Sequence, residues 1–124
     1  MTEPKKYSTV RKKEKVILEM SDGTEKPFFL CQMEGDLFED YMDENKDRLE
    51  TVIDEEKGTV KIVSIKSYKG MYSSLLCRCM TDVNDEYVSS EFISNLPLPT
   101  RKGLFEDAQR INAITEEAIA EVKN

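Results

Sequence analysis

An Asp-Gly pair between two apolar runs is the feature that most restricts the fold of this chain. Residues 15–20 and 28–33 each have the composition of a strand, and Ser21-Asp22-Gly23-Thr24 lies between them. Asp-Gly favours a tight turn with positive φ at both central residues, because both residue types tolerate the left-handed region. Pro27 has no N–H to donate, so it suits the start or the edge of the second strand. The sequence therefore predicts an antiparallel hairpin.

The hydrophobic period changes from two to about 3.6 after this hairpin. We expect a helix from Asp36, its N-cap, to about residue 49, with acidic side chains between the apolar ones. The apolar face comprises Leu37, Phe38, Tyr41, Met42 and Leu49. Two readings stay open for 51–65: a second hairpin around the turn at 55–58, or the end of the helix followed by one strand.

Three helical segments are expected in the second half. Tyr68, Tyr72, Leu75 and Cys79 recur at spacings of four, three and four, which predicts a core helix over 67–81. Ser89 or Ser90 should cap a short helix through Leu96, ended by Pro97 and Pro99. A last helix is expected from about 100 to 113, with a weak final turn from residue 115 through Val122. The predicted fold class is α+β: an N-terminal β-hairpin, an acidic helix, one or more short strands, then two or three packed helices.

The chain of 124 residues has room for one hydrophobic core. We expect a flexible basic tail over 1–14, a single α+β domain over 15–114 and a weakly structured tail over 115–124, with residues 1–12 dispensable for folding. No apolar run approaches the ~20 residues of a membrane span, and no secretory signal is visible. The three cysteines indicate a cytosolic protein with free thiols.

Charge is distributed very unevenly. The formal net charge is −7, but residues 1–15 carry six basic and two acidic side chains, whereas residues 16–56 carry three basic and fourteen acidic ones. This balance argues against nucleic acid as the main partner, since phosphate neutralisation needs a basic surface.

No pattern in the sequence predicts a metal, cofactor or catalytic site. Asp43, Asn45 and Asp47 match the first three ligand positions of a calcium loop, but Arg48 stands where that loop needs glycine, and Asp54 is shorter than the glutamate expected at its end. Cys77-Arg78-Cys79 is too closely spaced for zinc, and the chain has no histidine to complete a site or to activate a thiol. The remaining interpretation is a protein-binding surface, for which the acidic helix offers Phe38, Tyr41, Met42 and Asp43.

The order of these segments resembles the tail assembly chaperones of long-tailed, siphovirus-type phages and prophages. The resemblance covers about residues 15–114. This chain departs from the family pattern in the second strand, where Gln32 stands at a position that is expected to be acidic. In the first half it rests on Val16-Ile17-Leu18, Asp22-Gly23-Thr24-Glu25, Phe29-Leu30, Met33-Glu34-Gly35 and Asp40-Tyr41-Met42. In the second half it rests on Val60-Lys61-Ile62, Gly70-Met71, Leu75-Leu76-Cys77, Leu96-Pro97, Leu104-Phe105 and Ala108-Gln109.

The resemblance implies a non-enzymatic chaperone of the host cytoplasm. Such a protein binds the phage tape measure protein, helps to recruit tail tube protein, self-associates and is absent from the mature virion. It also implies a longer form made by ribosomal frameshifting, for which Val122-Lys123-Asn124 can be encoded by a slippery heptamer. Two other classes remain open: an acidic inhibitor that mimics nucleic acid on a host protein, and a structural tail or connector component.

Overall fold

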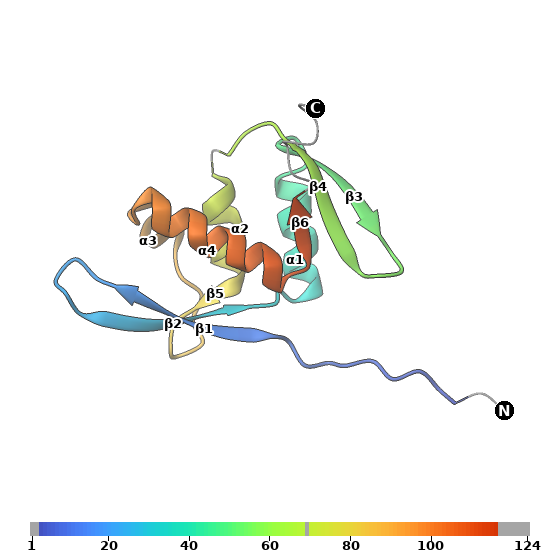
Figure 1. Ribbon diagram of the computed structural model, residues 1–124, viewed down its shortest axis with the longest axis horizontal. Coiled ribbons are helices and arrows are strands. Elements are labelled where there is room, and N and C mark those ends of the chain that lie inside the picture. Colours follow the sequence, from blue (N-terminus) through green and yellow to red (C-terminus); the bar gives the residue numbers. More distant parts are fainter. Residues whose placement is uncertain (1–2, 69, 117–124) are drawn as a thin grey trace.

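The predicted N-terminal hairpin is present, but its turn differs from the prediction. In the computed structural model, which describes residues 3–68 and 70–116, β1 (Lys13–Glu19) pairs antiparallel with β2 (Glu25–Cys31) (Figure 1). The Gly23 N–H donates to the Met20 carbonyl, and Gly23 alone among these described turn residues has a positive φ, 86°. The Asp22 carboxylate accepts hydrogen bonds from the Thr24 N–H at 2.9 Å and hydroxyl at 2.6 Å. The connection is thus a three-residue loop closed by a left-handed glycine, and the expected positive φ at Asp22 was wrong.

Pro27 lies inside β2, opposite Ile17, rather than at its start. The Met20 N–H donates to the Thr24 carbonyl at 2.7 Å, so hydrogen-bonded pairs alternate from that position and Pro27 falls at a pair without hydrogen bonds. Its nitrogen therefore faces away from β1. On that side, β5 (Met80–Thr81) pairs with β2 only at Phe29 and Leu30, so the proline interrupts neither ladder.

The acidic helix is shorter than predicted. Helix α1 spans Gly35–Glu44, its N-cap is Glu34, and Asp36 lies in its first turn. It ends at Asn45, whose backbone N–H and side-chain amide both donate to the Tyr41 carbonyl, at 3.2 and 2.8 Å. Leu49 therefore does not continue the helix face; it begins β3 (Leu49–Asp54), where it is buried.

The open choice over residues 51–65 resolves to a hairpin. Strand β3 pairs antiparallel with β4 (Thr59–Ile65), and β6 (Ile114–Glu116) pairs parallel with β4. The strand orders are β1-β2-β5 in one sheet and β3-β4-β6 in the other. Both predicted domain limits were too narrow, since β1 includes residues 13 and 14 and β6 includes 115 and 116. The expectations for residues 117–124, including the coding at 122–124, lie outside the described residues.

The remaining helices differ from the prediction mainly at their ends. Helix α2 (Met71–Cys79) starts after Gly70, whose φ is 78°, and stops where β5 begins. Helix α3 (Ser90–Ser94) is capped by Ser89, whose hydroxyl accepts from the Phe92 N–H at 3.1 Å. Helix α4 (Leu98–Ile111) holds Pro99 in its first turn, where a missing N–H costs nothing, so this proline does not end α3.

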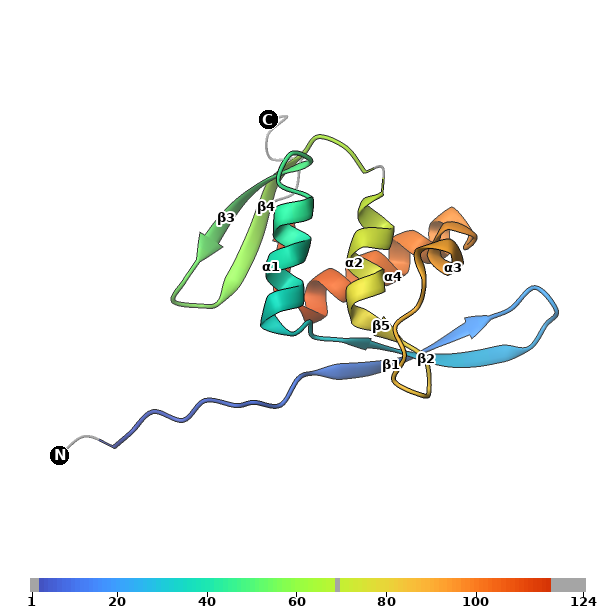
Figure 2. The same ribbon diagram turned by 180° about the vertical axis from the view of Figure 1, so that it is seen from behind.

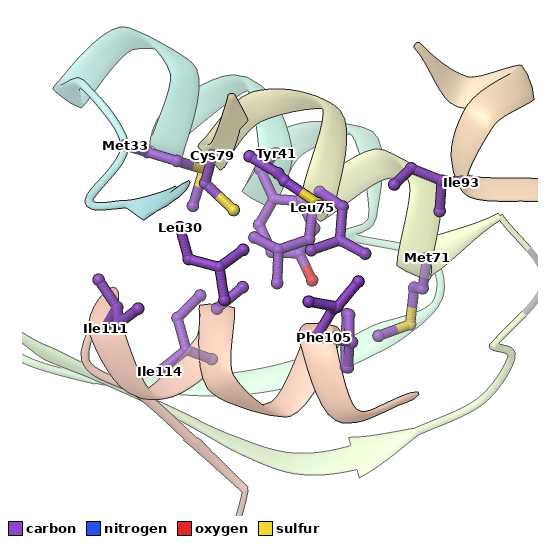
Figure 3. Close-up of a cluster of buried hydrophobic side chains, with 14 of the residues drawn as sticks. Leu30, Met33, Tyr41, Met71, Leu75, Cys79, Ile93, Phe105, Ile111 and Ile114 are labelled. Carbon is purple, nitrogen blue, oxygen red and sulfur yellow. The ribbon is translucent and has the colours of Figure 1, made fainter. Parts of the chain in front are cut away.

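One hydrophobic core lies among α1, α2, α4 and β2 (Figure 3). Side chains that are fully buried include Leu30, Tyr41, Leu75, Leu76, Cys79, Met80, Ile93 and Ala108. The two long hairpins lie outside this helical body, with β1–β2 reaching past α3 at one end and β3–β4 beside α1 (Figures 1 and 2). The predicted class, a single α+β domain that begins with a β-hairpin, is confirmed.

Candidate protein-binding groove

An open groove of about 490 Å³ lies between α1 and β3. Figure 2 shows the two elements on the same side of the molecule, with α1 beside the β3–β4 hairpin. Its lining is Phe38, Glu39, Met42, Asp43, Lys46, Leu49, Thr51 and Ile53. An apolar floor with charged side chains at its margins is the usual composition of a site that binds an amphipathic segment.

Three of the four residues predicted to contact a partner line this groove: Phe38, Met42 and Asp43. The fourth, Tyr41, has 0% of its surface exposed and points into the core near Leu75 (Figure 3). The helix turns about 100° per residue, so Phe38 and Met42 share a face from which Tyr41 is rotated toward α2. Tyr41 is therefore a packing residue, and its assignment as a contact residue is corrected.

The strand side of the groove was not foreseen. Leu49, Thr51 and Ile53 alternate along β3, so they share one face of the strand, whereas Val52 lies on the other. Ile53 is 62% exposed and Val52 55%. The alternation of Leu49, Thr51 and Ile53 is visible in the sequence, but assigning Leu49 to the helix breaks this alternation and conceals the strand face.

The groove is set in the most acidic part of the chain. Residues 34–54 carry nine acidic and two basic side chains, a net charge of −7. Glu39 and Asp43 are both exposed, and Asp43 forms an ion pair with Lys46 at 3.6 Å. That pair is open to solvent and contributes little stability, so both groups can exchange it for charges on a partner.

A polar network ties the end of α1 to α2; its members Asn45 and Ser74 are buried, whereas the Glu44 side chain is open to solvent. The Asn45 amide donates to the Ser74 hydroxyl at 2.8 Å, and that hydroxyl donates to the Glu44 carboxylate. Arg78 donates to the same carboxylate at 2.8 Å. The hydrogen bond from Ser74, followed by that from Arg78, holds the pKa of Glu44 below its ordinary value. The C-terminal turn of α1, which forms one wall of the groove, is thus tied to α2.

A second hollow, about 820 Å³, lies where the β1–β2 hairpin passes α3 and the start of α4. Phe92, Leu96 and Met20 contribute to its lining, and among the described residues that line it Glu19 alone is charged. It brings together none of the predicted contact residues and lies outside the acidic segment. The α1–β3 groove is therefore the better candidate site.

The cysteines behave as packing residues. Cys79 lies on the buried stripe of α2 as predicted, and burial raises the pKa of its thiol to about 12. Cys77 is rotated away and half-buried. Within residues 3–68 and 70–116 no three acidic or cysteine side chains are grouped so that they could hold a metal ion. The residues that match the start of a calcium loop do not form a loop here: Asp43 belongs to α1, and the Asn45 side-chain amide donates to Tyr41 and Ser74.

Comparison with protein-family models, with curated proteins and with solved structures finds no match to this chain. Among the described helices, none combines the length and apolar composition needed to cross a lipid bilayer.

Proposed function

We propose that this protein is a tail assembly chaperone of a long-tailed phage or prophage. In this role it binds the tape measure protein in the host cytoplasm, helps to recruit tail tube protein, and is absent from the mature virion. The resemblance over residues 15–114 supplies the identity of the client. One structural observation supports the presence of a client site: the apolar groove between α1 and β3, set in a segment of net charge −7.

The groove suits a client whose apolar side chains need shielding. Phe38 and Met42 from α1 and Ile53 from β3 are positioned to cover one apolar stripe of a client helix. Each large apolar side chain that becomes fully buried contributes about 1.5–3 kcal/mol. Glu39 and Asp43 at the margin would meet basic residues of the client, which raises the rate of association more than its strength.

The protein's own charge also helps to keep an apolar client in solution. A net charge of −7 on 124 residues keeps a complex with an apolar client dispersed through mutual repulsion. The proposed activity is non-enzymatic, since it requires only reversible binding by a surface of this kind.

The test is binding of tape measure fragments to variants of the groove. Ile53→Lys places a charge on its apolar floor, and we expect at least a tenfold loss of affinity. Val52→Lys is the matched control, because Val52 is comparably exposed on the same strand but faces away from the groove; it should bind within about twofold of wild type. Equal losses from both variants would remove the groove from the proposal.

The other two function classes are separated by further measurements. Phe38→Ala should weaken client binding more than Asp43→Asn, because apolar anchors dominate interfaces and rim charges contribute less. Equal losses would favour the acidic inhibitor. Mass spectrometry of purified phage particles should find none of this protein; its presence in stoichiometric amount would favour a structural tail or connector component.

A further inference from the structure

The segment that precedes β1 carries apolar side chains away from its own molecule. We call residues 3–12 the arm; it has no helix or strand, and it runs outward from the body in both views (Figures 1 and 2). Tyr7 is 83% exposed and Val10 80%. The arm carries four basic side chains, Lys5, Lys6, Arg11 and Lys12, against Glu3.

The direction of the arm is set where it leaves the sheet. The Gln32 N–H donates to the Lys12 carbonyl at 2.8 Å, and the Lys12 N–H donates to the Gln32 side-chain oxygen at 2.7 Å. Arg11 adds a hydrogen bond to the Gln32 carbonyl at 3.4 Å and an ion pair with Glu34 at 3.7 Å. These contacts continue the β1–β2 pairing as far as residue 11, and beyond it Tyr7 and Val10 are exposed to solvent.

We propose that the arm of one copy docks into the α1–β3 groove of a second copy. The two surfaces are complementary in charge: apart from Arg11 and Glu34, which pair within one copy, the arm has a net charge of +2 and residues 35–54 have −6. They are also complementary in polarity, because the groove offers Phe38, Met42 and Ile53 to the exposed Tyr7 and Val10. Basic side chains around two apolar anchors are the chemistry that we proposed for the client.

This inference rests on the proposed function only in taking the same groove as a binding surface. Each copy offers one arm and one groove, so two copies can exchange arms in a closed pair, or copies can join head to tail in a longer chain. A client then competes with the arm for the groove, and client-free copies remain associated through their arms.

The experiment uses two full-length variants that are each defective in one partner surface. Tyr7→Ala with Val10→Ala removes the anchors of the arm, and Ile53→Lys blocks the groove. We expect wild type to self-associate with rising concentration in sedimentation velocity at low salt, and each variant alone to be monomeric. An equimolar mixture should give a heterodimer that grows no further, because the intact arm of one variant fills the intact groove of the other.

Matched controls keep the result specific. Ser8→Ala with Thr9→Ala alters the arm between its anchors, and Val52→Lys adds the same charge to the opposite face of β3; both should self-associate within about threefold of wild type. Raising the salt concentration to 0.5 M should weaken association, since exposed charges are screened beyond a few ångströms. A wild-type protein that stays monomeric, or a mixture of the two variants that does not associate, overturns the proposal. An arm that docks in the groove of its own copy would leave the wild type monomeric, and it would overturn the proposal in the same way.

Client binding distinguishes this failure from failure of the proposed function. If the arm competes, the Tyr7→Ala, Val10→Ala variant should bind tape measure fragments several-fold more tightly than wild type. Client binding that Ile53→Lys abolishes and the arm variant leaves unchanged would retain the chaperone site and reject the arm. Self-association that obeys the mixing test without any client binding would retain the arm and reject the chaperone.

Discussion

Asn112 joins the end of α4 to the end of β2, and its replacement by alanine tests the energetics of the fold. Its side-chain oxygen accepts from the Met33 N–H at 2.6 Å. Its amide donates to the Ala108 carbonyl at 2.9 Å and to the Cys31 carbonyl at 3.3 Å. The side chain is buried, so all three contacts are shielded from water.

The expected loss of stability follows from these three contacts. In Asn112→Ala the buried Met33 N–H loses its acceptor, and an orphaned buried donor costs about 1–3 kcal/mol. The two lost amide bonds contribute about 0.5–1.5 kcal/mol each, the longer one at the lower end of that range. We expect the free energy of unfolding to fall by about 3 kcal/mol, a large share of the ~5–15 kcal/mol of a typical domain.

Equilibrium unfolding in urea measures this loss. With a slope of about 2 kcal/mol per molar, the midpoint should fall by about 1.5 M without a change in slope. Asn95→Ala is the control, because Asn95 also caps a helix C-terminus with similar backbone angles but is exposed. Its effect should stay within about 0.5 kcal/mol. An Asn112→Ala variant as stable as the control would refute the reasoning that this buried amide holds α4 to β2.

Two further predictions concern titratable groups. The folded protein lowers the pKa of Glu44 from its ordinary 4.5, so the carboxylate contributes stability above about pH 4.5 that is lost as the pH falls through its lower folded value. In urea unfolding, the stability that Glu44→Gln loses relative to wild type should therefore shrink between pH 7 and pH 3. A loss of stability that does not change with pH would contradict this assignment. Burial raises the pKa of Cys79 to about 12, so at pH 8 a disulfide reagent should label the half-buried Cys77 first and Cys79 only on unfolding. Peptide mass spectrometry measures the labelling rate of each cysteine. Equal labelling rates in the folded protein would count against a closed core around Cys79.

Local chemistry in the sequence was sufficient to determine several elements. The glycine at residue 23 between two apolar runs specified a hairpin, because a left-handed residue is needed to reverse the chain there. Ser89 specified the start of α3 through its hydroxyl, which needs only a partner three residues away. Phe38 and Met42 could be selected as surface candidates because the period of α1 places them together.

The ends of the elements depended on residues far away in the sequence. The apolar period of the first helix continues to Leu49, but the helix stops at Asn45, whose side-chain amide bonds both to Tyr41 within the helix and to Ser74, 29 residues further along the chain. Met80 fits the face of α2 equally well, yet it pairs with Leu30 in a strand. Periodicity describes what one segment can bury, whereas these contacts depend on which segment lies opposite.

The groove shows the same division most clearly. The sequence placed Phe38, Tyr41 and Met42 on the apolar side of an acidic helix, and the helical period alone does not show which of them another element covers. Packing against α2 buries Tyr41 completely, while β3, brought alongside by its hairpin, leaves Phe38 and Met42 lining an open groove with Ile53. Which apolar side chain becomes core and which remains available to a partner is decided by the neighbouring elements, because burial is a property of the pair of surfaces and not of the residue.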